Sequence, residues 1–267
     1  MLDKKTKRVL LVVAYDGTNY HGWQLQSNGV TIESELNRHL TELLGENIRV
    51  SGASRTDSGV HALGNLAVFD TESRIPAEKI SYALNQRLPE DIRIQKSMEV
   101  EPDFHPRKCA MKKTYEYRIT CAPFPIPTKR LYSHYTYCQP DVEAMRRAAV
   151  YLVGEHDFKS FCSTGNQTET TVRRIYDLQV LTEGTDLVIR VQGNGFLYNM
   201  VRILAGTLLD VGFGRKTPEE IPGILEAGRR DAAGPTAPAR GLTLIGYEIA
   251  ENQAKSGKKG IDTHGNV

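Results

Sequence analysis

The spacing of apolar residues divides the first part of the chain into alternating strands and helices. Residues 8–15 form a short apolar and β-branched run that is typical of a strand. Residues 31–44 carry apolar side chains at helical spacing, with Thr31 as the predicted N-cap and Gly45 as the stop. Further strands are predicted over 48–53, 60–69 and 92–100, and a second helix over 76–88. The order β-α-β-β-α-β is that of a ferredoxin-like unit.

The second part of the chain repeats this order of elements without an evident repeat of sequence. Strands are predicted over 113–120, 172–181, 187–191 and 242–249, and helices over 140–153, 196–211 and 217–228. The helix over 196–211 is too thickly apolar for a surface element, so we expect it to be buried.

These patterns predict an α+β fold of two ferredoxin-like or RRM-like units. Their antiparallel sheets are expected side by side, with an active-site cleft between the units. We place the N-terminal unit at residues 1–106, the C-terminal unit at 107–250 and a disordered polar tail at 251–267. The same order also suits a tandem RNA-recognition module, although the aromatic string by which such modules stack bases is missing. Fold analogy alone does not choose between the two.

Composition narrows the class of protein. The 267 residues are 40% hydrophobic and 25% charged, as expected of a soluble globular chain, and the apolar run 9–14 is far too short to span a membrane. The four cysteines form no C-x-x-C pair and the seven histidines no H-E-x-x-H motif, so we expect free thiols and no metal. A cytoplasmic, metal-free protein is the expectation.

Charge is balanced overall but uneven along the chain. Lys plus Arg total 34 against 32 for Asp plus Glu, so no global basic excess indicates nucleic-acid binding. Residues 107–118, however, hold one acid, Glu116, among five cations: Arg107, Lys108, Lys112, Lys113 and Arg118. This basic strip is either a solvated strand edge or a surface that contacts phosphates.

One loop combines opposite charges with small residues. In GASRTDSGVHA, residues 52–62, Arg55 and Asp57 stand two positions apart, and the small neighbours indicate a flexible loop with room around it. A lone aspartate here is more often a turn residue than a catalytic one. A carboxylate that serves as nucleophile must be ionised, and an arginine partner keeps it so when water leaves the site.

The octet RTDSGVHA, residues 55–62, resembles the active-site signature of the bacterial tRNA pseudouridine synthase A (TruA) family. Further blocks resemble the family in the same order along the chain: YDGTNYHGWQ (15–24), FHPRKCAMKKTYEY (104–117), GNGFLYNMVRILAGTL (193–208) and GLTL (241–244). The resemblance spans nearly the whole chain except the tail.

The resemblance implies an isomerase that converts uridine within tRNA to pseudouridine. The N1–C1′ bond breaks, uracil turns, and C5 bonds to C1′, so no cofactor, metal or ATP is required. By resemblance Asp57 attacks C1′ or removes the C2′ proton, and the sequence leaves both open. Covalent catalysis by a carboxylate at an anomeric carbon has precedent in glycosidases. The implied substrate is the anticodon stem-loop, around tRNA positions 38 to 40, and family members are typically homodimers.

The same resemblance implies roles for other residues. Tyr115 would stack on the flipped uracil, where otherwise a strand tyrosine in the core is the simpler interpretation. Arg202 would pair with Asp57, because a buried arginine needs an anionic partner. Arg55 would help to displace the base or hold a phosphate.

The remaining candidates are assigned by position and chemistry. The substrate-binding set is completed by three cations of the basic strip: Arg107, Lys112 and Lys113. His61 is interpreted as structural and Trp23 as a packing anchor. Two alternatives stay open: a non-catalytic tandem RNA-binding module, and a pseudouridine synthase with another RNA target.

Overall fold

The structure is a computed structural model that describes residues 6–107, 109, 111–165 and 168–249. The predicted tail at 251–267 lies outside the described residues, as does Lys108 of the basic strip. The chain forms two compact units, which take their described residues from Met1–Met111 with Leu244–Val267, and from Lys112–Thr243. The side-by-side arrangement with a cleft between the units stays a prediction.

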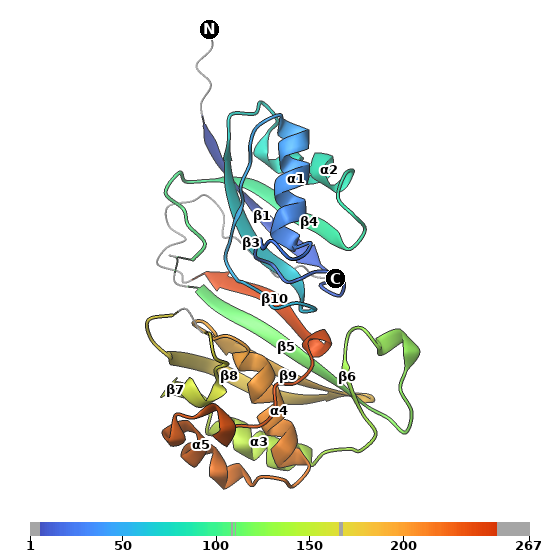
Figure 1. Ribbon diagram of the computed structural model, residues 1–267, viewed down its shortest axis with the longest axis vertical. Coiled ribbons are helices and arrows are strands. Elements are labelled where there is room, and N and C mark those ends of the chain that lie inside the picture. The colour runs from blue at the N-terminus through green and yellow to red at the C-terminus, as the bar shows by residue number, and fades with distance from the viewer. Residues whose placement is uncertain (1–5, 108, 110, 166–167, 250–267) are drawn as a thin grey trace. The chain divides into compact units, whose positions relative to one another are not determined.

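The first unit is a sheet with two helices on one side (Figure 1). Its elements are β1 (Lys7–Tyr15), α1 (Ile32–Leu44), β2 (Ser51–Gly52), β3 (His61–Thr71), α2 (Ala77–Asn85), β4 (Ile92–Val100) and the closing strand β10 (Leu242–Ile249). The strand order is β4-β1-β3-β10, and β2 also pairs with β3. All pairs among β1, β2, β3 and β4 are antiparallel, as a ferredoxin-like unit requires.

Local signals explain why α1 begins and ends where predicted. The Thr31 hydroxyl accepts from the Ser34 backbone N–H, and the Ser34 hydroxyl accepts from the Thr31 N–H, so the capping box is complete. Gly45 ends the helix in the left-handed conformation at φ 67°. Leu36 and Leu40 are fully buried, so the apolar stripe of α1 faces the core.

The strand predicted over 48–53 shrinks to the two residues of β2. The backbone N–H of Ile48 donates to the Thr41 hydroxyl at 3.1 Å, and that of Val50 donates to Asn37 Oδ1 at 2.8 Å. Side chains of α1 therefore satisfy the backbone groups that a longer strand would have paired with β3.

The second unit is also built on an antiparallel sheet. Its elements are β5 (Met111–Cys121), β6 (His134–Thr136), α3 (Val142–Val150), β7 (Gly154–Asp157), β8 (Val172–Glu183), β9 (Asp186–Gly193), α4 (Met200–Gly212) and α5 (Ile221–Ala227). The strand order is β5-β9-β8-β7, and β6 joins β5 as a parallel pair. The short strands β6 and β7 were not predicted, since the sequence GEHD of β7 has no apolar alternation.

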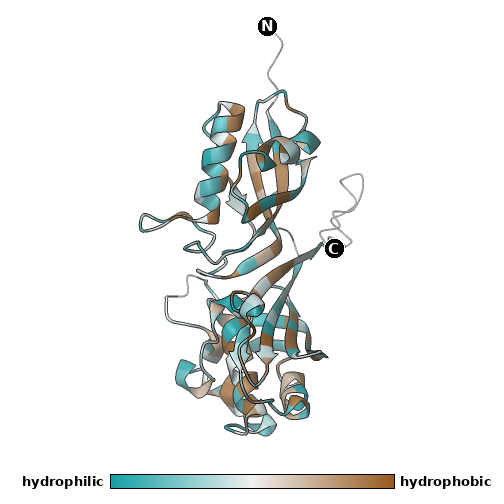
Figure 2. Cartoon of the chain, turned by 90° about the vertical axis from the view of Figure 1, so that its right-hand side faces the viewer, coloured by the Kyte–Doolittle hydropathy of each residue, from teal (hydrophilic) through white to brown (hydrophobic). Residues whose placement is uncertain are grey.

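In Figure 2 the strands carry many brown, hydrophobic positions, whereas α1 is mostly teal on the side in view.

The predicted α+β class is confirmed, and so is the element order of the first unit from β1 to β4. The second unit differs from its predicted order, because β6 and β7 are added and the closing strand β10 belongs to the first unit from Leu244 onward. One helix start also shifts. The helix predicted over 196–211 begins at Met200, because Asn199 takes the left-handed conformation at φ 61° and interrupts the helical backbone. Asn199 is the one non-glycine residue with positive φ among those described. Apart from Arg202, every residue of α4 is buried, which confirms the expected burial of this helix.

Candidate active site

The loop that carries Asp57 is anchored on both sides of the aspartate. Thr56 is buried, its hydroxyl lies 2.7 Å from the Tyr15 hydroxyl, and its carbonyl accepts from the Trp23 N–H at 3.0 Å. The Ser54 carbonyl accepts from Asn65 Nδ2 at 3.0 Å. Buried polar groups with satisfied hydrogen bonds restrict a loop far more than exposed ones do.

A tight turn follows directly after the aspartate. The Val60 N–H donates to the Asp57 carbonyl at 3.1 Å, and Gly59 supplies the positive φ of 77°. The loop 16–22 approaches so closely that a Cβ atom on Gly22 would lie 2.6 Å from the Thr56 carbonyl oxygen. Gly22 itself has φ +84°, so both its backbone angle and its surroundings favour glycine.

The expectation of a flexible loop with room around it is therefore wrong for its first half. Gly52 packs against the Trp23 indole, and a Cβ atom at Gly52 would lie 2.3 Å from Trp23 Nε1. Ser54 and Thr56 are buried, whereas Arg55 is exposed and Asp57 half-buried. The small residues serve close packing below the loop, and the two charged side chains occupy its accessible side.

Two residues interpreted as structural lie beside this loop. Trp23 is 2% exposed and packs its ring 5.8 Å from that of Tyr15, as expected of a packing anchor. His61 is buried, with Nδ1 3.1 Å from the Gly17 N–H and 3.0 Å from Asp16 Oδ1. One nitrogen cannot accept from the first and donate to the second at once, so Nδ1 forms a hydrogen bond with one of them at a time. Either contact holds the loop that follows β1.

Arg107 reaches the same loop from the segment that precedes β5. Its Nε donates to the Gly52 carbonyl at 2.8 Å, although the residue as a whole is exposed. Part of the guanidinium is thus committed to the backbone of β2, and the rest faces outward.

In the second unit Tyr115 lies on β5 with its ring packed against Phe196. The two ring centroids are 5.2 Å apart at an interplanar angle of 84°, and Tyr115 is 7% exposed. Because side chains alternate along a strand, Lys113 shares the face of Tyr115 and Lys112 belongs to the opposite face. Lys112 Nζ lies 5.3 Å from the ring centroid of Tyr176.

Arg202 is held near the start of α4 by neutral oxygen atoms. Its Nη1 donates to Asn199 Oδ1 at 2.7 Å and its Nε to the Ala237 carbonyl at 2.7 Å. These two acceptors orient the guanidinium. Burial raises the pKa of Tyr117 above its usual range, while the positive charges of Arg202 and Arg240 oppose that shift.

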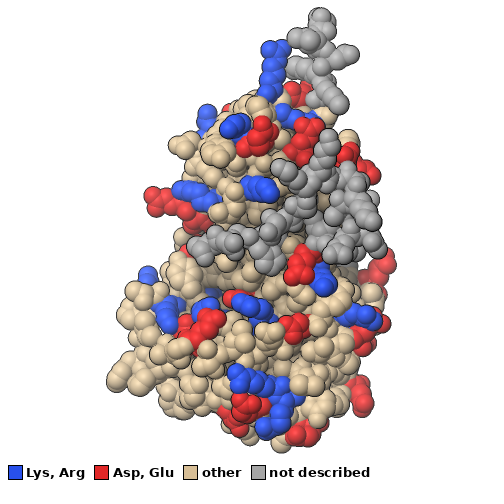
Figure 3. Space-filling model, turned by 180° about the vertical axis from the view of Figure 1, so that it is seen from behind, with Lys and Arg blue, Asp and Glu red and all other residues tan. Residues whose placement is uncertain are grey.

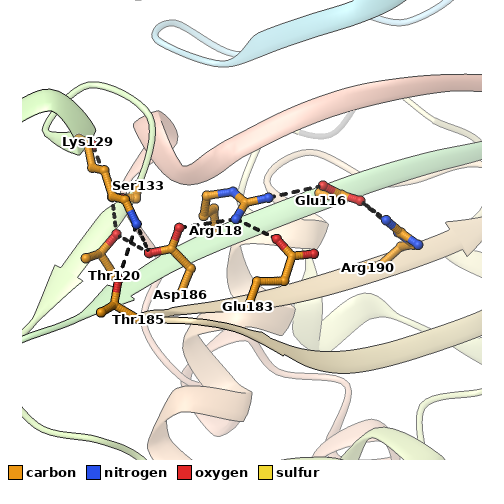
Figure 4. A network of polar contacts seen from close by, with 9 residues as sticks. All are labelled: Glu116, Arg118, Thr120, Lys129, Ser133, Glu183, Thr185, Asp186 and Arg190. Carbon is orange, nitrogen blue, oxygen red and sulfur yellow. Dashed lines mark hydrogen bonds and ion pairs between the residues drawn. The ribbon is translucent and has the colours of Figure 1, made fainter. Parts of the chain in front are cut away.

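The basic strip divides between the two faces of β5. On the outer face Arg190 donates to Glu116 at 2.7 Å, and Arg118 donates to Glu183 at 2.9 Å and to Asp186 at 3.2 Å (Figure 4). Arg118 is therefore charge-compensated and is a poor candidate for phosphate contact. In Figure 3 blue and red side chains are likewise interspersed over the face in view.

The predicted site residues are divided between the two units. Arg55, Asp57 and Arg107 belong to the first unit, and Lys112, Lys113, Tyr115 and Arg202 to the second. The predicted Asp57–Arg202 pair joins the two units and stays a prediction. Among the described residues no group of three or more His, Cys, Asp or Glu side chains is arranged to hold a metal ion. No helix in the described ranges is long and apolar enough to cross a membrane.

Two supporting residues were missed from the sequence. Asn65 lies buried in β3 and bonds the Asp57 loop, and its signal was an amide in the middle of an apolar strand, in HALGNLAVF. Asn199 orients Arg202, and its signal was an asparagine, which tolerates positive φ, just before a helix.

Comparison with known proteins identifies the family. The family model described as tRNA pseudouridine synthase matches residues 11–107 and 148–248. A relative from Ruminiclostridium cellulolyticum, called tRNA pseudouridine synthase A, is 48% identical over 240 residues, which are 90% of this chain and 98% of the relative. Proteins of the same name from Acetivibrio thermocellus and Brevibacillus brevis are 47% and 46% identical over 90% and 89% of this chain, and 98% of each relative. The chain belongs to the tRNA pseudouridine synthase family, a family of isomerases.

Proposed function

We propose that this enzyme isomerises uridine to pseudouridine in the anticodon stem-loop of tRNA, at positions 38, 39 and 40. Asp57 is the nucleophile, and no cofactor takes part. Membership of the family over most of the chain supports the reaction class, and the octet around Asp57 supports the site.

The observation that carries the site is the contrast between Asp57 and its neighbours. Ser54 and Thr56 before it are buried and hydrogen-bonded, and the Asp57 carbonyl closes the following turn, yet Asp57 itself is half-buried rather than covered. A carboxylate on a rigid, accessible support can meet the ribose of an extruded uridine in one geometry.

The other residues divide the work. Arg202 pairs with Asp57 and keeps its carboxylate charged, and Tyr115 contacts the extruded uracil. Arg55, exposed beside Asp57, fills the space of the displaced base or holds a phosphate. Arg107, Lys112 and Lys113 contact the RNA backbone, and Lys113 does so on the face of Tyr115. The enzyme acts as a homodimer in the cytoplasm.

The test is to map pseudouridine by position in unmodified tRNA transcripts after incubation with the wild-type enzyme. Asp57→Asn is the variant expected to be inactive. Asp70→Asn is the matched control, because it makes the same change at a surface carboxylate, which pairs with Arg8 at 2.7 Å. We expect modification at positions 38 to 40 by the wild type and Asp70→Asn, and none by Asp57→Asn.

Other outcomes would redirect the proposal. Modification elsewhere in tRNA, or only in another RNA, would contradict the anticodon stem-loop and favour a synthase with another target. RNA binding without any product would favour a non-catalytic binding module. A salt titration adds a second readout, since binding through a few phosphate contacts weakens steeply as ionic strength rises.

A further inference from the structure

One buried asparagine beneath the Asp57 loop uses its whole hydrogen-bonding capacity. Asn65 in β3 is fully buried. Its Nδ2 donates to the Ser54 carbonyl at 3.0 Å and to the Tyr15 hydroxyl at 3.3 Å. Its Oδ1 accepts from the Tyr247 hydroxyl at 2.7 Å and, more weakly, from the Ser54 N–H at 3.4 Å. A side-chain amide has two donors and two acceptor positions, so this set is complete.

The same amide reaches Thr56 through Tyr15. The Tyr15 hydroxyl accepts from Asn65 Nδ2 and also lies 2.7 Å from the Thr56 hydroxyl, where either hydroxyl can be the donor. Asn65 thus fixes Ser54 directly and Thr56 through Tyr15. These two residues flank Arg55, and Asp57 follows at once.

The third partner of the Asn65 side chain, after Ser54 and Tyr15, is the hydroxyl of Tyr247. Tyr247 belongs to β10, lies 182 positions from Asn65, and is 1% exposed. In this unit β10 is the neighbour of β3 in the strand order. The carboxy-terminal strand therefore contributes a polar group to the support of the Asp57 loop as well as a sheet partner.

We propose that Asn65 is a positioning residue for Asp57 and that Tyr247 completes its orientation, so that the carboxy-terminal strand holds the reactive loop in place. The catalytic consequence rests on the proposed function, whereas the anchoring of the loop does not. Only an amide satisfies the site: a carboxylate would lose both donors, and a shorter apolar side chain would leave buried partners unsatisfied.

The primary test uses Tyr247→Phe, which removes one oxygen atom from a buried ring, together with Asn65→Ala. Two controls match them in the same unit. Tyr82→Phe makes the same change at a tyrosine that is 70% exposed. Asn85→Ala removes an asparagine that bonds the Ile94 backbone at 2.9 and 2.8 Å, far along the sequence from the loop.

The first readout is amide hydrogen exchange at three N–H groups: Ser54, which donates to the Asn65 side chain, and Trp23 and Val60, which donate to carbonyls of the loop. We expect exchange there to be about tenfold faster in Tyr247→Phe and Asn65→Ala than in the wild type, with no change in the two controls. Unchanged exchange in both test variants would overturn the proposal whether or not the enzyme is active.

The second readout is steady-state and single-turnover kinetics on tRNA. The positioning role predicts that kcat falls about 10- to 100-fold in Asn65→Ala, and less in Tyr247→Phe, while KM stays within about twofold. Asn85→Ala should lower the unfolding midpoint and leave kcat of the folded enzyme unchanged. An equal loss of kcat in Asn85→Ala and Asn65→Ala would show an effect of stability alone and overturn the role. A wild type without product would contradict the proposed function, and exchange would still decide the anchoring.

Discussion

The Asp57 loop and the outer face of β5 and β9 are both dense in polar side chains, but different forces organise them. Beneath the loop the contacts of Asn65, Tyr15 and Thr56 are neutral, buried hydrogen bonds. On the outer face the contacts are ion pairs between partly exposed side chains, such as Arg190 with Glu116 (Figure 4).

The difference decides what each region tolerates. A neutral network of buried hydrogen bonds fixes positions and is sensitive to the loss of one atom. Exposed ion pairs contribute little to the free energy of unfolding and weaken with salt. A site that must hold one carboxylate in one place therefore relies on buried, neutral hydrogen bonds. Exposed ion pairs suit a surface.

Substitution of Arg202, which is proposed to pair with Asp57, should differ most from substitution of an arginine on the outer face. Arg202→Leu is expected to lower the single-turnover rate about 1000-fold, while tRNA affinity changes only a few-fold, because the proposed charge partner of the Asp57 carboxylate is then lost. Arg190→Leu, the same change at an arginine whose charge Glu116 compensates, should alter the rate less than twofold. A loss confined to affinity in Arg202→Leu would remove it from the catalytic set.

Glycine substitutions should show how closely the backbone approaches the loop. Gly22→Ala should destabilise the protein by about 2–4 kcal/mol, since positive φ strain adds to an overlap with the Thr56 carbonyl. Gly45→Ala also has positive φ, but no atom lies within 4 Å of the added Cβ, so about 1 kcal/mol is expected. Urea unfolding measures both, and equal losses would mean that the close approach costs nothing.

Asp186, the buried carboxylate of the ion-pair network, should affect how the free energy of unfolding changes at acid pH. Burial raises the pKa of Asp186, but bonds from Lys129, Thr120 and Arg118 lower it more, so the net pKa lies below its usual range. Its contribution is complete above the ordinary value of about 3.9 and is lost as pH falls through the lower native pKa.

Asp186→Asn should therefore cost about 1–2 kcal/mol at pH 7 and flatten the loss of stability below about pH 4. Urea midpoints across that range give the answer, with Asp177→Asn on β8 as the surface control. If the urea midpoints of wild type and Asp186→Asn fell equally steeply below about pH 4, ionised Asp186 would not be the stabilising group that we infer.

The exposed part of the network should matter least. Glu116→Gln is expected to cost about 0.5 kcal/mol at low salt and less at 1 M salt, because the charge of Arg190 is then screened. Unfolding at the two salt concentrations provides the measurement. A loss of unfolding free energy above about 2 kcal/mol that does not depend on salt would mean that the Arg190–Glu116 pair stabilises the fold as a buried interaction does.

Much of the fold could be predicted because its signals are local. Thr31 and Gly45 mark the ends of α1 through capping chemistry that a few neighbouring residues determine. The β2 strand could not be bounded in this way, since Asn37 and Thr41 of the preceding helix accept from the backbone N–H groups just before it. The closing strand β10 also shows the limit, because from Leu244 onward it belongs to the first unit.

The site residues also divide into those with a local sequence signal and those that come together only on folding. Asp57 was found because its motif is contiguous in the sequence, whereas Asn65 and Tyr247 meet only in the folded sheet. The small residues near Asp57 predict a flexible loop when read from the sequence alone. They serve instead the contact of Gly52 with Trp23, which pattern alone does not reveal.

The most direct measurement is the single-turnover rate of pseudouridine formation by Asp57→Asn, with tRNA binding measured on the same preparation. The central claim is that Asp57 is the reacting carboxylate on an intact support. It predicts binding within about twofold of the wild type and a rate at least about 10⁴-fold lower. Product formation at the wild-type rate, with binding unchanged, would contradict it.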